Sequence, residues 1–424
     1  LSTQRFLASL LHGGTVPFSG HLFAHVYRFS LQQKKRYSLT EFVPCSQRER
    51  GIAPGLQLVG VFGLNYDYCL SLFWLVNEQL MLNKNLSLKN MNQKIKIDSI
   101  QAYVYRLPLK VPVKSQYLKL TSRPALFICL RDEQGNEGWG EVWCNFPEYG
   151  AEHRKLLIDS LATPVLKGYE YSHPCQVYDK LLNVLDLYAI QSGETGTFAQ
   201  IISGLDIAAW DLAAKRAGLP LAKYINPQAE NSVKCYASAL DVNNTGVAAE
   251  ALLEAGHRAF KLKIGFSKEM DRRNLAEIRS AGGDQVSIFA DANQRWADAQ
   301  EAAEKLAELE DFNIAFIEEP LNVHAPDREW LKLKSLTDIP LASGENIMGN
   351  QEFERYIKAG ALTHLQIDIA KWGGISQGLV HAAMAQEEGM SVTPHYLGAG
   401  IGLLASSHFL AAVGGSGYQE FDAN

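Results

Sequence analysis

The sequence predicts an α/β protein whose C-terminal half forms a barrel of parallel strands. From residue 233 onward, apolar strand-like segments alternate with helical segments, which is typical of a parallel sheet covered by helices. Seven such strands lie within about 165 residues, and this spacing favours a closed barrel over an open sheet. We expect the strands at residues 233–240, 259–264, 286–291, 315–319, 341–345, 364–369 and 391–395.

An antiparallel meander is expected before the barrel, between residues 94 and 142. Its apolar segments flank the turn sequence Asp132-Glu-Gln-Gly-Asn136, which is typical of a hairpin. A helix is expected at residues 198–217, because apolar residues recur there at steps of three and four, and a glycine and a proline follow.

Residues 1–90 differ from the rest of the chain, because no sustained helix or strand period runs through them. Their apolar stretch at 56–82 is interrupted by Asn65, Asp67, Asn77 and Glu78. A charge at bilayer depth costs about 2.5–3.5 kcal/mol, so we expect no membrane span. We predict that residues 1–90 are an extension outside the enzyme fold.

Composition and charge exclude several classes of function. A chain of 424 residues suggests two or three domains. A net charge of −6 and a pI of about 6.0 offer no basic surface for a nucleic acid. The six cysteines form no CxxC motif, and a chain of this length needs no disulfides, so we expect a protein of the reducing cytoplasm.

An ionisable residue recurs at the end of six successive predicted strands. The intervals are 28, 27, 27, 23 and 27 residues, about the length of one strand, one helix and two loops. A single strand-end Asp often only caps the next helix, but six residues in this register converge on the carboxyl-end rim of a barrel, where active sites form. The six residues are Lys263, Asp291, Glu318, Glu345, Asp368 and His395.

Lysines and an amide extend this rim. Side chains two apart on a strand share a face, so Lys261 and Lys263 both point inward, as do Asp291 and Asn293. Repulsion between the two ammonium groups is expected to lower the pKa of at least one of them. The sequence therefore predicts a lysine base.

Three rim carboxylates, those of Asp291, Glu318 and Glu345, come from adjacent strands. Packed together they would repel one another unless a cation lies between them. All-oxygen ligands favour a hard ion, so we predict Mg²⁺, which Mn²⁺ could replace. Zinc and copper are not favoured, because the sequence places no Cys or His near these carboxylates.

Asp368 and His395 end the next two predicted strands. A carboxylate bonded to one imidazole nitrogen fixes the tautomer and supports the charged ring. The sequence therefore predicts a second acid or base, opposite Lys263.

These motifs resemble the enolase superfamily, in its mandelate racemase subgroup. The resemblance extends over residues 95–424. It rests on Lys261-Leu-Lys263, Asp291-Ala-Asn293, Ile317-Glu-Glu-Pro320, Gly344-Glu-Asn346, Asp368 with Lys371-Trp-Gly-Gly374, Pro394-His395, and the segment Gly204-Leu-Asp-Ile-Ala-Ala-Trp-Asp-Leu-Ala-Ala-Lys215.

The resemblance implies a fold and a set of roles. An N-terminal α+β capping domain, residues 95–225, would cover a modified TIM barrel, (β/α)₇β, at 226–424. Asp291, Glu318 and Glu345 would bind Mg²⁺, which stabilises an enediolate, and Lys263 would be one base with Lys261 beside it. Asp368 and His395 would form the opposing acid or base, Glu420 would hydrogen-bond the substrate carboxylate, and Asn293 would help to hold the intermediate.

Substrate contacts are implied at the cap and at one barrel loop. Cap loops near Lys114 and Tyr117 and at residues 144–149 would select the substrate, and Lys371 is a further candidate for binding it. Two features depart from the family pattern: Tyr224-Ile-Asn226 stands where a Leu-Gly pair is usual, and relatives usually continue past Asn424 with a tail that returns to the cap. We expect such a truncation to weaken domain docking.

Several reactions fit these residues. Dehydration of an acid sugar to a 2-keto-3-deoxy acid is the favoured prediction, and racemisation or epimerisation of a 2-hydroxy acid is the alternative, with cycloisomerisation third. A non-catalytic ligand-binding relative and a Schiff-base aldolase that uses Lys263 are alternatives of other classes. The partners expected are a small carboxylate substrate and further copies of the chain, with no nucleic acid and no membrane.

Overall fold

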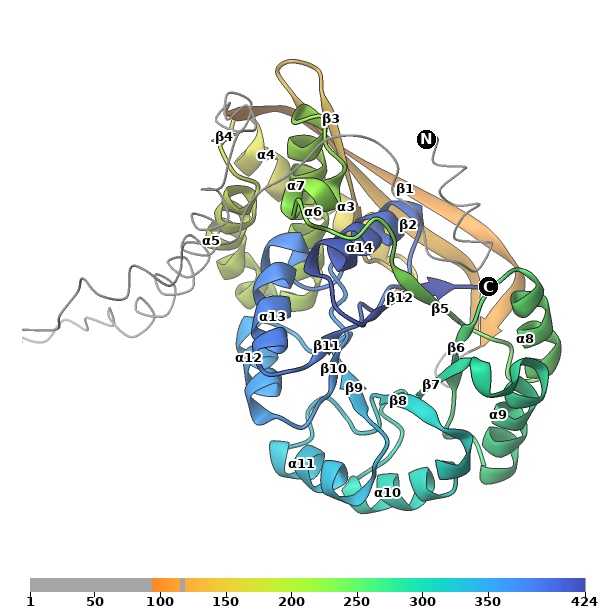
Figure 1. Cartoon of the computed structure of the whole chain (residues 1–424). Helices are drawn as coiled ribbons and strands as arrows, with labels where there is room; N and C mark the ends of the chain where they lie inside the picture. The colour runs from red at the N-terminus through yellow and green to blue at the C-terminus, as the bar shows by residue number, and fades with distance from the viewer. Residues whose placement is uncertain (1–93, 115–118, 424) are drawn as a thin grey trace, which may run out of the picture. The chain divides into compact units, whose positions relative to one another are not determined.

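The structure is a computed structural model that describes residues 94–114 and 119–423 (Figure 1). The predicted extension at residues 1–90 lies outside this part. Among the residues described, no helix combines the length and the apolar character needed to cross a bilayer. The described residues form two sheets, one of four strands and one of eight.

The smaller sheet is antiparallel, with the order β3-β2-β1-β4. β1 (Ile95–Lys114) pairs with β2 (Lys119–Asp132), and β2 pairs with β3 (Glu137–Val142), as the meander predicts. The short strand β4 (Glu170–Tyr171), which the sequence analysis did not predict, pairs with β1.

Helices cover the smaller sheet, and the helix at residues 195–216 packs so closely on β3 that only glycine fits at two positions of that strand. A Cβ at Gly138 would lie 2.2 Å from the carbonyl oxygen of Ala208, and one at Gly140 would lie 2.0 Å from that of Gly204, so β3 and α6 approach through their backbones. α6 confirms the predicted helix, starting three residues earlier. The helices are α3 (Gly150–Leu157), α4 (Thr163–Leu166), α5 (Cys175–Ser192), α6 (Thr195–Arg216) and α7 (Leu221–Ile225), with a π-helical turn at Ile158–Ala162.

The larger sheet is parallel and nearly closed, with the order β11-β10-β9-β8-β7-β6-β5-β12. Glu420 N–H donates to the Pro394 carbonyl oxygen at 3.4 Å, which links the two end strands. The predicted barrel is therefore confirmed. The strands are β5 (Lys234–Ser238), β6 (Ala259–Lys263), β7 (Ser287–Asp291), β8 (Ile314–Glu318), β9 (Leu341–Ser343), β10 (His364–Leu365), β11 (Ser391–Val392) and β12 (Tyr418–Asp422).

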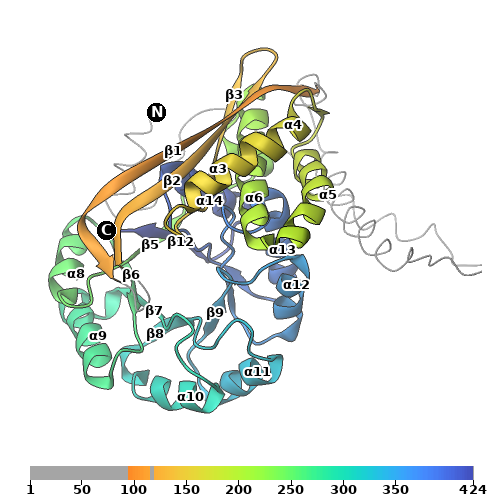
Figure 2. The same ribbon diagram turned by 180° about the vertical axis from the view of Figure 1, so that it is seen from behind.

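Seven helices alternate with these strands and lie outside them, as Figures 1 and 2 show from opposite sides. This order confirms the (β/α)₇β arrangement, whose last strand, β12, was absent from the seven strands expected from periodicity. The helices are α8 (Thr245–Glu254), α9 (Lys268–Gly282), α10 (Ala299–Ala307), α11 (Asp327–Leu336), α12 (Asn350–Ala359), α13 (Gly374–Glu387) and α14 (Gly400–Val413).

The last three predicted strands were drawn too long. β9, β10 and β11 end at Ser343, Leu365 and Val392, so Glu345, Asp368 and His395 lie in the loops just beyond them. Backbone hydrogen bonds between neighbouring strands still continue past the ends of these strands. For example, the N–H of Thr393 donates to the Leu365 carbonyl oxygen at 2.9 Å. These loops place side chains at the rim without a regular strand.

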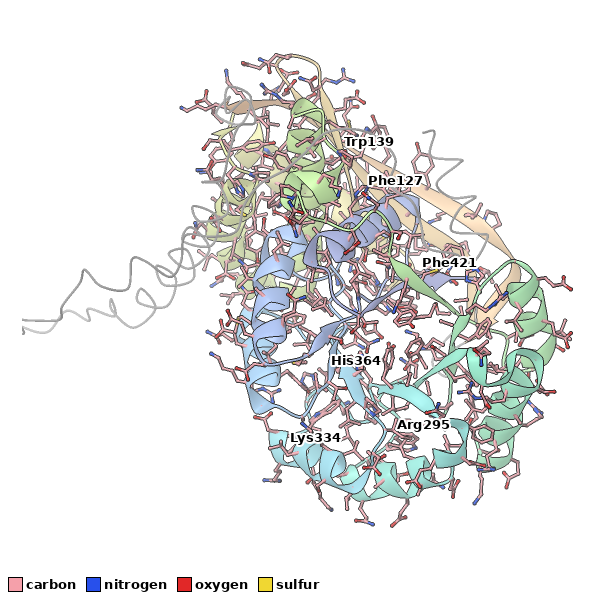
Figure 3. All side chains as sticks on the ribbon, in the orientation of Figure 1. Phe127, Trp139, Arg295, Lys334, His364 and Phe421 are labelled. Carbon is pink, nitrogen blue, oxygen red and sulfur yellow. The ribbon has the colours of Figure 1, made fainter. Side chains whose placement is uncertain are left out.

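Buried aromatic rings fill the barrel below its carboxyl-end rim. The ring centroids of Tyr236 and Phe289 lie 5.1 Å apart, and those of Phe289 and Phe316 lie 4.4 Å apart. The ring of His364, which is labelled in Figure 3, contacts Phe316 with a centroid distance of 5.0 Å. Aromatic pairs at such distances add to the free energy of burial.

Replacing Phe316 with alanine is expected to lower the free energy of unfolding by about 3–5 kcal/mol, because a fully buried ring leaves a cavity. Chemical denaturation would measure this. The exposed Leu331 provides the control, since its replacement by alanine should change stability by about 0.5 kcal/mol or less. An equal effect of both substitutions would contradict the buried position of Phe316.

The four-stranded sheet and its helices contact the barrel through α6. The indole Nε1 of Trp210 donates to Ser376 Oγ at 2.9 Å, and Asp206 accepts from the Ser376 backbone N–H at 2.9 Å. A cap that contacts a modified TIM barrel is the architecture that the resemblance implied. The predicted domain limits at residues 225 and 226 stay a prediction.

Candidate active site

Alternation along the strands places a charged layer directly above the aromatic one. On β7, Phe289 belongs to the aromatic layer and Asp291 follows it by two residues; on β8, Phe316 and Glu318 repeat the pattern. Lys263 is paired in register with Asp291, and Asp291 with Glu318. The predicted convergence of these three strand ends is therefore present.

Lys261 lies in the centre of the charged layer, with 4% of its surface exposed. Its Nζ is 2.7 Å from Glu318 Oε2 and 2.8 Å from Glu420 Oε1, and it stands 5.3 Å from the ring centroid of Tyr236. Burial lowers the pKa of Lys261, but the carboxylates of Glu318 and Glu420 outweigh burial and hold the pKa well above its usual value.

Lys263 contacts the two neighbouring residues that the sequence analysis placed on its side of the rim. Its Nζ lies 2.5 Å from Asp291 Oδ2 and donates to Asn293 Oδ1 at 2.9 Å. Burial lowers the pKa of Lys263, but the charges of Asp291, Glu318 and Glu345 together outweigh it, and the pKa lies above its usual value. The predicted net lowering of a lysine pKa was therefore wrong. Lys261 does lower the pKa of Lys263, but the nearby carboxylates raise it by more.

His395 forms the predicted pair with Asp368. Its Nδ1 is 2.9 Å from Asp368 Oδ2, and its Nε2 is 3.4 Å from Glu345 Oε2 and 3.8 Å from Glu420 Oε2. Burial lowers the pKa of His395, but the charges of Glu345 and Glu420 raise it to about 9. His395 lies far from the three carboxylates in the sequence, but the loop after β11 brings its ring beside Glu345.

Glu420 joins the lysine side of the site to the histidine side. One of its oxygens contacts Lys261, and the other accepts a hydrogen bond from the backbone N–H of Tyr396 at 3.2 Å, next to His395. Burial raises the pKa of Glu420, but Lys261 and His395 outweigh it and leave the pKa below its usual value. Glu420 is therefore charged in this surrounding.

Lys371 lies beside Glu345. Its Nζ is 3.3 Å from Glu345 Oε2 and donates to Asn346 Oδ1 at 2.8 Å, and it stands 4.8 Å from the ring centroid of Trp143. Burial raises the pKa of Glu345, but the charges of His395 and Lys371 outweigh it and hold the pKa below its usual range. A cap aromatic ring therefore meets a rim cation here, and the role of Lys371 in substrate binding stays a prediction.

The carboxylates fit a hard cation in the chemistry of their donors. Glu318 Oε1 is buried without a hydrogen-bond partner, and burial together with the Asp291 charge raises the pKa of Glu318 to about 7. Burial and the Glu345 charge raise the pKa of the adjacent Glu319 to about 8. Within residues 94–423 as described, no three Asp, Glu, His or Cys side chains stand close enough together to hold one ion. The donor atoms nevertheless suit Mg²⁺, because these carboxylates repel one another and Glu318 has an oxygen without a hydrogen-bond partner.

The buried residues Gln366 and Glu319 and the partly buried Asn346 also lie at the rim, and the sequence analysis gave none of them a role in the site. Gln366 Nε2 donates to Glu318 Oε2 at 2.7 Å, and Asn346 Nδ2 donates to Glu319 Oε2 at 2.9 Å. Gln366 precedes Asp368 by two residues, so strand alternation could have identified it. Tyr117 lies outside the described residues, as does the side chain of Lys114.

Family models match both parts of the chain. Residues 99–225 match the model described as the mandelate racemase / muconate lactonizing enzyme N-terminal domain. Residues 245–424 match the model described as enolase C-terminal domain-like.

Individual proteins agree with these matches. L-talarate/galactarate dehydratase of Salmonella typhimurium is 31% identical over 317 residues, which are 71% of this chain and 76% of that protein. The structure of a mandelate racemase/muconate lactonizing enzyme from Bordetella bronchiseptica RB50 is 40% identical, with a TM-score of 0.72, and the match covers 78% of this chain and 89% of that one. A racemase from Streptomyces coelicolor A3(2), solved with bound magnesium, is 25% identical with a TM-score of 0.69 over 77% of this chain and 89% of that one.

Other relatives are named dehydratases, racemases and cycloisomerases. These comparisons, together with the in-register Lys263, Asp291 and Glu318 and the Asp368–His395 pair, lead to one conclusion: the chain is an enzyme of the enolase superfamily and belongs to its mandelate racemase/muconate lactonizing enzyme group.

Proposed function

We propose that the enzyme dehydrates an acid sugar, removing the proton next to the substrate carboxylate and forming a 2-keto-3-deoxy acid. The observation that carries this proposal is the presence of two proton-transfer groups, each with its own carboxylate. Lys263 contacts Asp291, and His395 contacts Asp368. Dehydration needs one group to take a proton and another to give one to the leaving hydroxyl, so two separately supported groups suit it.

The residues proposed to hold the cofactor are Asp291, Glu318 and Glu345, with Mg²⁺ as the ion. When bound, Mg²⁺ would supply positive charge against the negative charge that develops on the substrate carboxylate. The unpartnered oxygen of Glu318 supports this assignment.

Lys263 is the proposed base. Once the ammonium group has lost a proton to solvent, the neutral Nζ would accept the α-proton, while Asn293, which accepts a hydrogen bond from that Nζ at 2.9 Å, orients it. Lys261 would reduce the repulsion between the carboxylates of Glu318 and Glu420, since its ammonium group lies within 2.8 Å of an oxygen of each.

His395 is the proposed acid. Because Nδ1 faces Asp368, the tautomer is fixed and Nε2 remains to donate its proton to the β-hydroxyl group. The C–O bond then breaks, water leaves, and the enol product tautomerises to the 2-keto acid. Without a β-hydroxyl leaving group, the same two residues could exchange the α-proton, so racemisation of a 2-hydroxy acid is the second candidate.

Incubating the protein with Mg²⁺ and a panel of aldonates and aldarates should form a 2-keto acid from at least one of them, detected as its semicarbazone. EDTA should abolish the product and added Mg²⁺ should restore it. Inverted substrate without keto acid would favour the racemase. Activity that resists EDTA, with a borohydride-trapped adduct on Lys263, would contradict the proposal and support the aldolase; binding without turnover would support a ligand-binding protein.

A further inference from the structure

The loop between β11 and α14 carries His395, and a cap carboxylate holds its far end. Glu141, near the end of β3, has 3% of its surface exposed. Its Oε1 accepts a hydrogen bond from the Ala399 N–H at 2.5 Å, and its Oε2 accepts one from the Gly402 N–H at 2.9 Å. These donors lie at the N-terminus of α14, where free N–H groups and the helix dipole favour a carboxylate.

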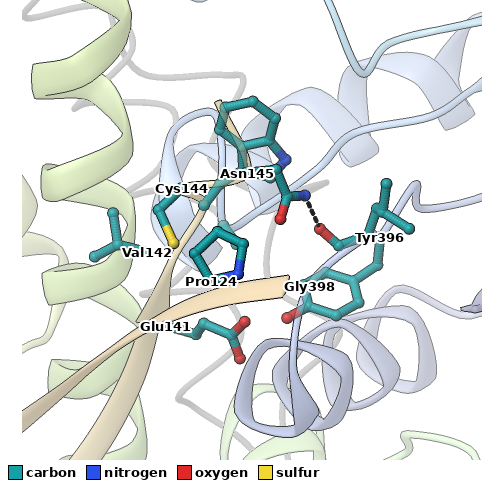
Figure 4. A pocket seen from close by; sticks show the side chains of 10 residues that line it. Pro124, Glu141, Val142, Cys144, Asn145, Tyr396 and Gly398 are labelled. Carbon is teal, nitrogen blue, oxygen red and sulfur yellow. Dashed lines mark hydrogen bonds between the residues drawn. The ribbon is translucent and has the colours of Figure 1, made fainter. Parts of the chain in front are cut away.

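Two neighbours of Glu141 in the cap reach the same part of the barrel. Asn145 Nδ2 donates to the Leu397 carbonyl oxygen at 2.7 Å, the bond drawn in Figure 4. The Trp143 N–H donates to the carbonyl oxygen of Ala370 at 3.2 Å, and Ala370 follows Asp368 by two residues. Cap residues 141–145 therefore contact both barrel loops that carry the Asp368–His395 pair.

Glu141 also lies close to the side chain of Tyr396, the residue that follows His395. The Tyr396 hydroxyl group donates to the Ala399 carbonyl oxygen at 2.7 Å. A Cβ added at Gly398 would lie 2.4 Å from the Tyr396 hydroxyl oxygen and 2.8 Å from Glu141 Oε1. The Glu141 carboxylate and the Tyr396 hydroxyl group therefore lie against the same point of the loop that carries His395.

We propose that Glu141, assisted by Asn145, is a positioning residue that sets the place of His395 in the active site. The inference rests on the proposed function, in which His395 protonates the leaving hydroxyl and Lys263 removes the α-proton. Glu141 would then act on the step that needs His395 and leave the Lys263 step intact. This links the cap to proton transfer as well as to substrate choice.

Glu141→Gln is the informative variant. The amide keeps the shape but turns an NH₂ group toward one of two N–H donors, so at least one bond at the start of α14 is lost. We expect kcat for dehydration to fall roughly 10–100-fold with KM nearly unchanged, since a displacement of about 1 Å can cost this much. In D₂O, the ratio of deuterated recovered substrate to keto acid should rise about tenfold, as in His395→Asn, because the intermediate returns to substrate when the acid is misplaced.

Asp132→Asn is the matched control. Asp132 is another buried cap carboxylate that accepts two backbone N–H bonds, from Gln134 at 3.0 Å and Asn136 at 2.8 Å, but inside the cap. The Asp132→Asn substitution should leave the ratio of deuterated substrate to keto acid unchanged, even if it lowers the stability of the protein. Glu141→Asp, which keeps the charge, should restore part of the wild-type ratio, and Asn145→Ala should shift the ratio in the same direction as Glu141→Gln but less.

Two results separate this inference from the proposed function. Wild-type protein that forms no keto acid from any acid sugar would contradict the proposed function. Hydrogen exchange measured by mass spectrometry gives a second reading: residues 393–402 should exchange faster in Glu141→Gln than in Asp132→Asn or the wild type. Unchanged exchange in this segment, or an equal loss of dehydration and α-proton exchange, would overturn the positioning role.

Discussion

Replacing Lys263 with alanine is expected to lower the rate of α-proton exchange by about 10²–10⁴-fold, the usual contribution of a positioned base. Lys263 ends β6 in register with Asp291, and its Nζ contacts both Asp291 and Asn293. The neighbouring amine, that of Lys261, is held by Glu318 and Glu420 instead. Proton NMR of the substrate α-position in D₂O would measure the change.

Lys358→Ala supplies the control for Lys263→Ala. Lys358 lies on α12 with 64% of its side chain exposed and pairs only weakly, at 3.3 Å, with Glu354 one turn away. Its removal should leave exchange unchanged. If folded Lys263→Ala protein exchanges the α-proton as fast as the Lys358→Ala protein, Lys263 is not the base.

Replacing Glu318 with glutamine is expected to weaken Mg²⁺ binding by at least about 100-fold and to lower activity in parallel. Loss of a residue that merely supports a metal ligand already costs about 10–100-fold in affinity, and a direct ligand should cost more. The fold should survive, because Lys261 keeps its contact with Glu420 at 2.8 Å and Gln366 can turn to the new amide.

Calorimetric titration with Mg²⁺ would test the Glu318→Gln prediction. Glu329→Gln is the control, since that carboxylate accepts a hydrogen bond from the Ala299 N–H among the outer helices. Equal affinities of the two variants for Mg²⁺ would show that Glu318 is not a ligand.

The register of the site was predictable, because each strand–helix unit has nearly the same length. A spacing of 27 or 28 residues brings Lys263, Asp291 and Glu318 to the same level on adjacent strands, and the structure pairs them there. After β8 the spacing of ionisable residues predicted the structure less well, because the strands are short there and Glu345, Asp368 and His395 lie in loops. Asp368 and His395 still meet, because their loops follow neighbouring strands.

Contacts between distant segments could not be predicted from local pattern. The pKa of Lys261 depends on Glu420, which lies on the last strand and contacts it only when β12 pairs with β5. Repulsion from Lys263 was visible in the sequence, whereas this attraction was not. Glu141 is similar, since its partners Ala399 and Gly402 follow it by more than 250 residues.

We propose that this site removes a proton from the carbon next to a carboxylate. The direct measurement is deuterium incorporation at that carbon of acid sugars in D₂O, with wild-type protein and Mg²⁺, before and after EDTA. We predict incorporation into substrate or product that stops with EDTA and resumes with Mg²⁺. Mg²⁺-loaded, folded protein that exchanges no α-proton in any acid of the panel would contradict it.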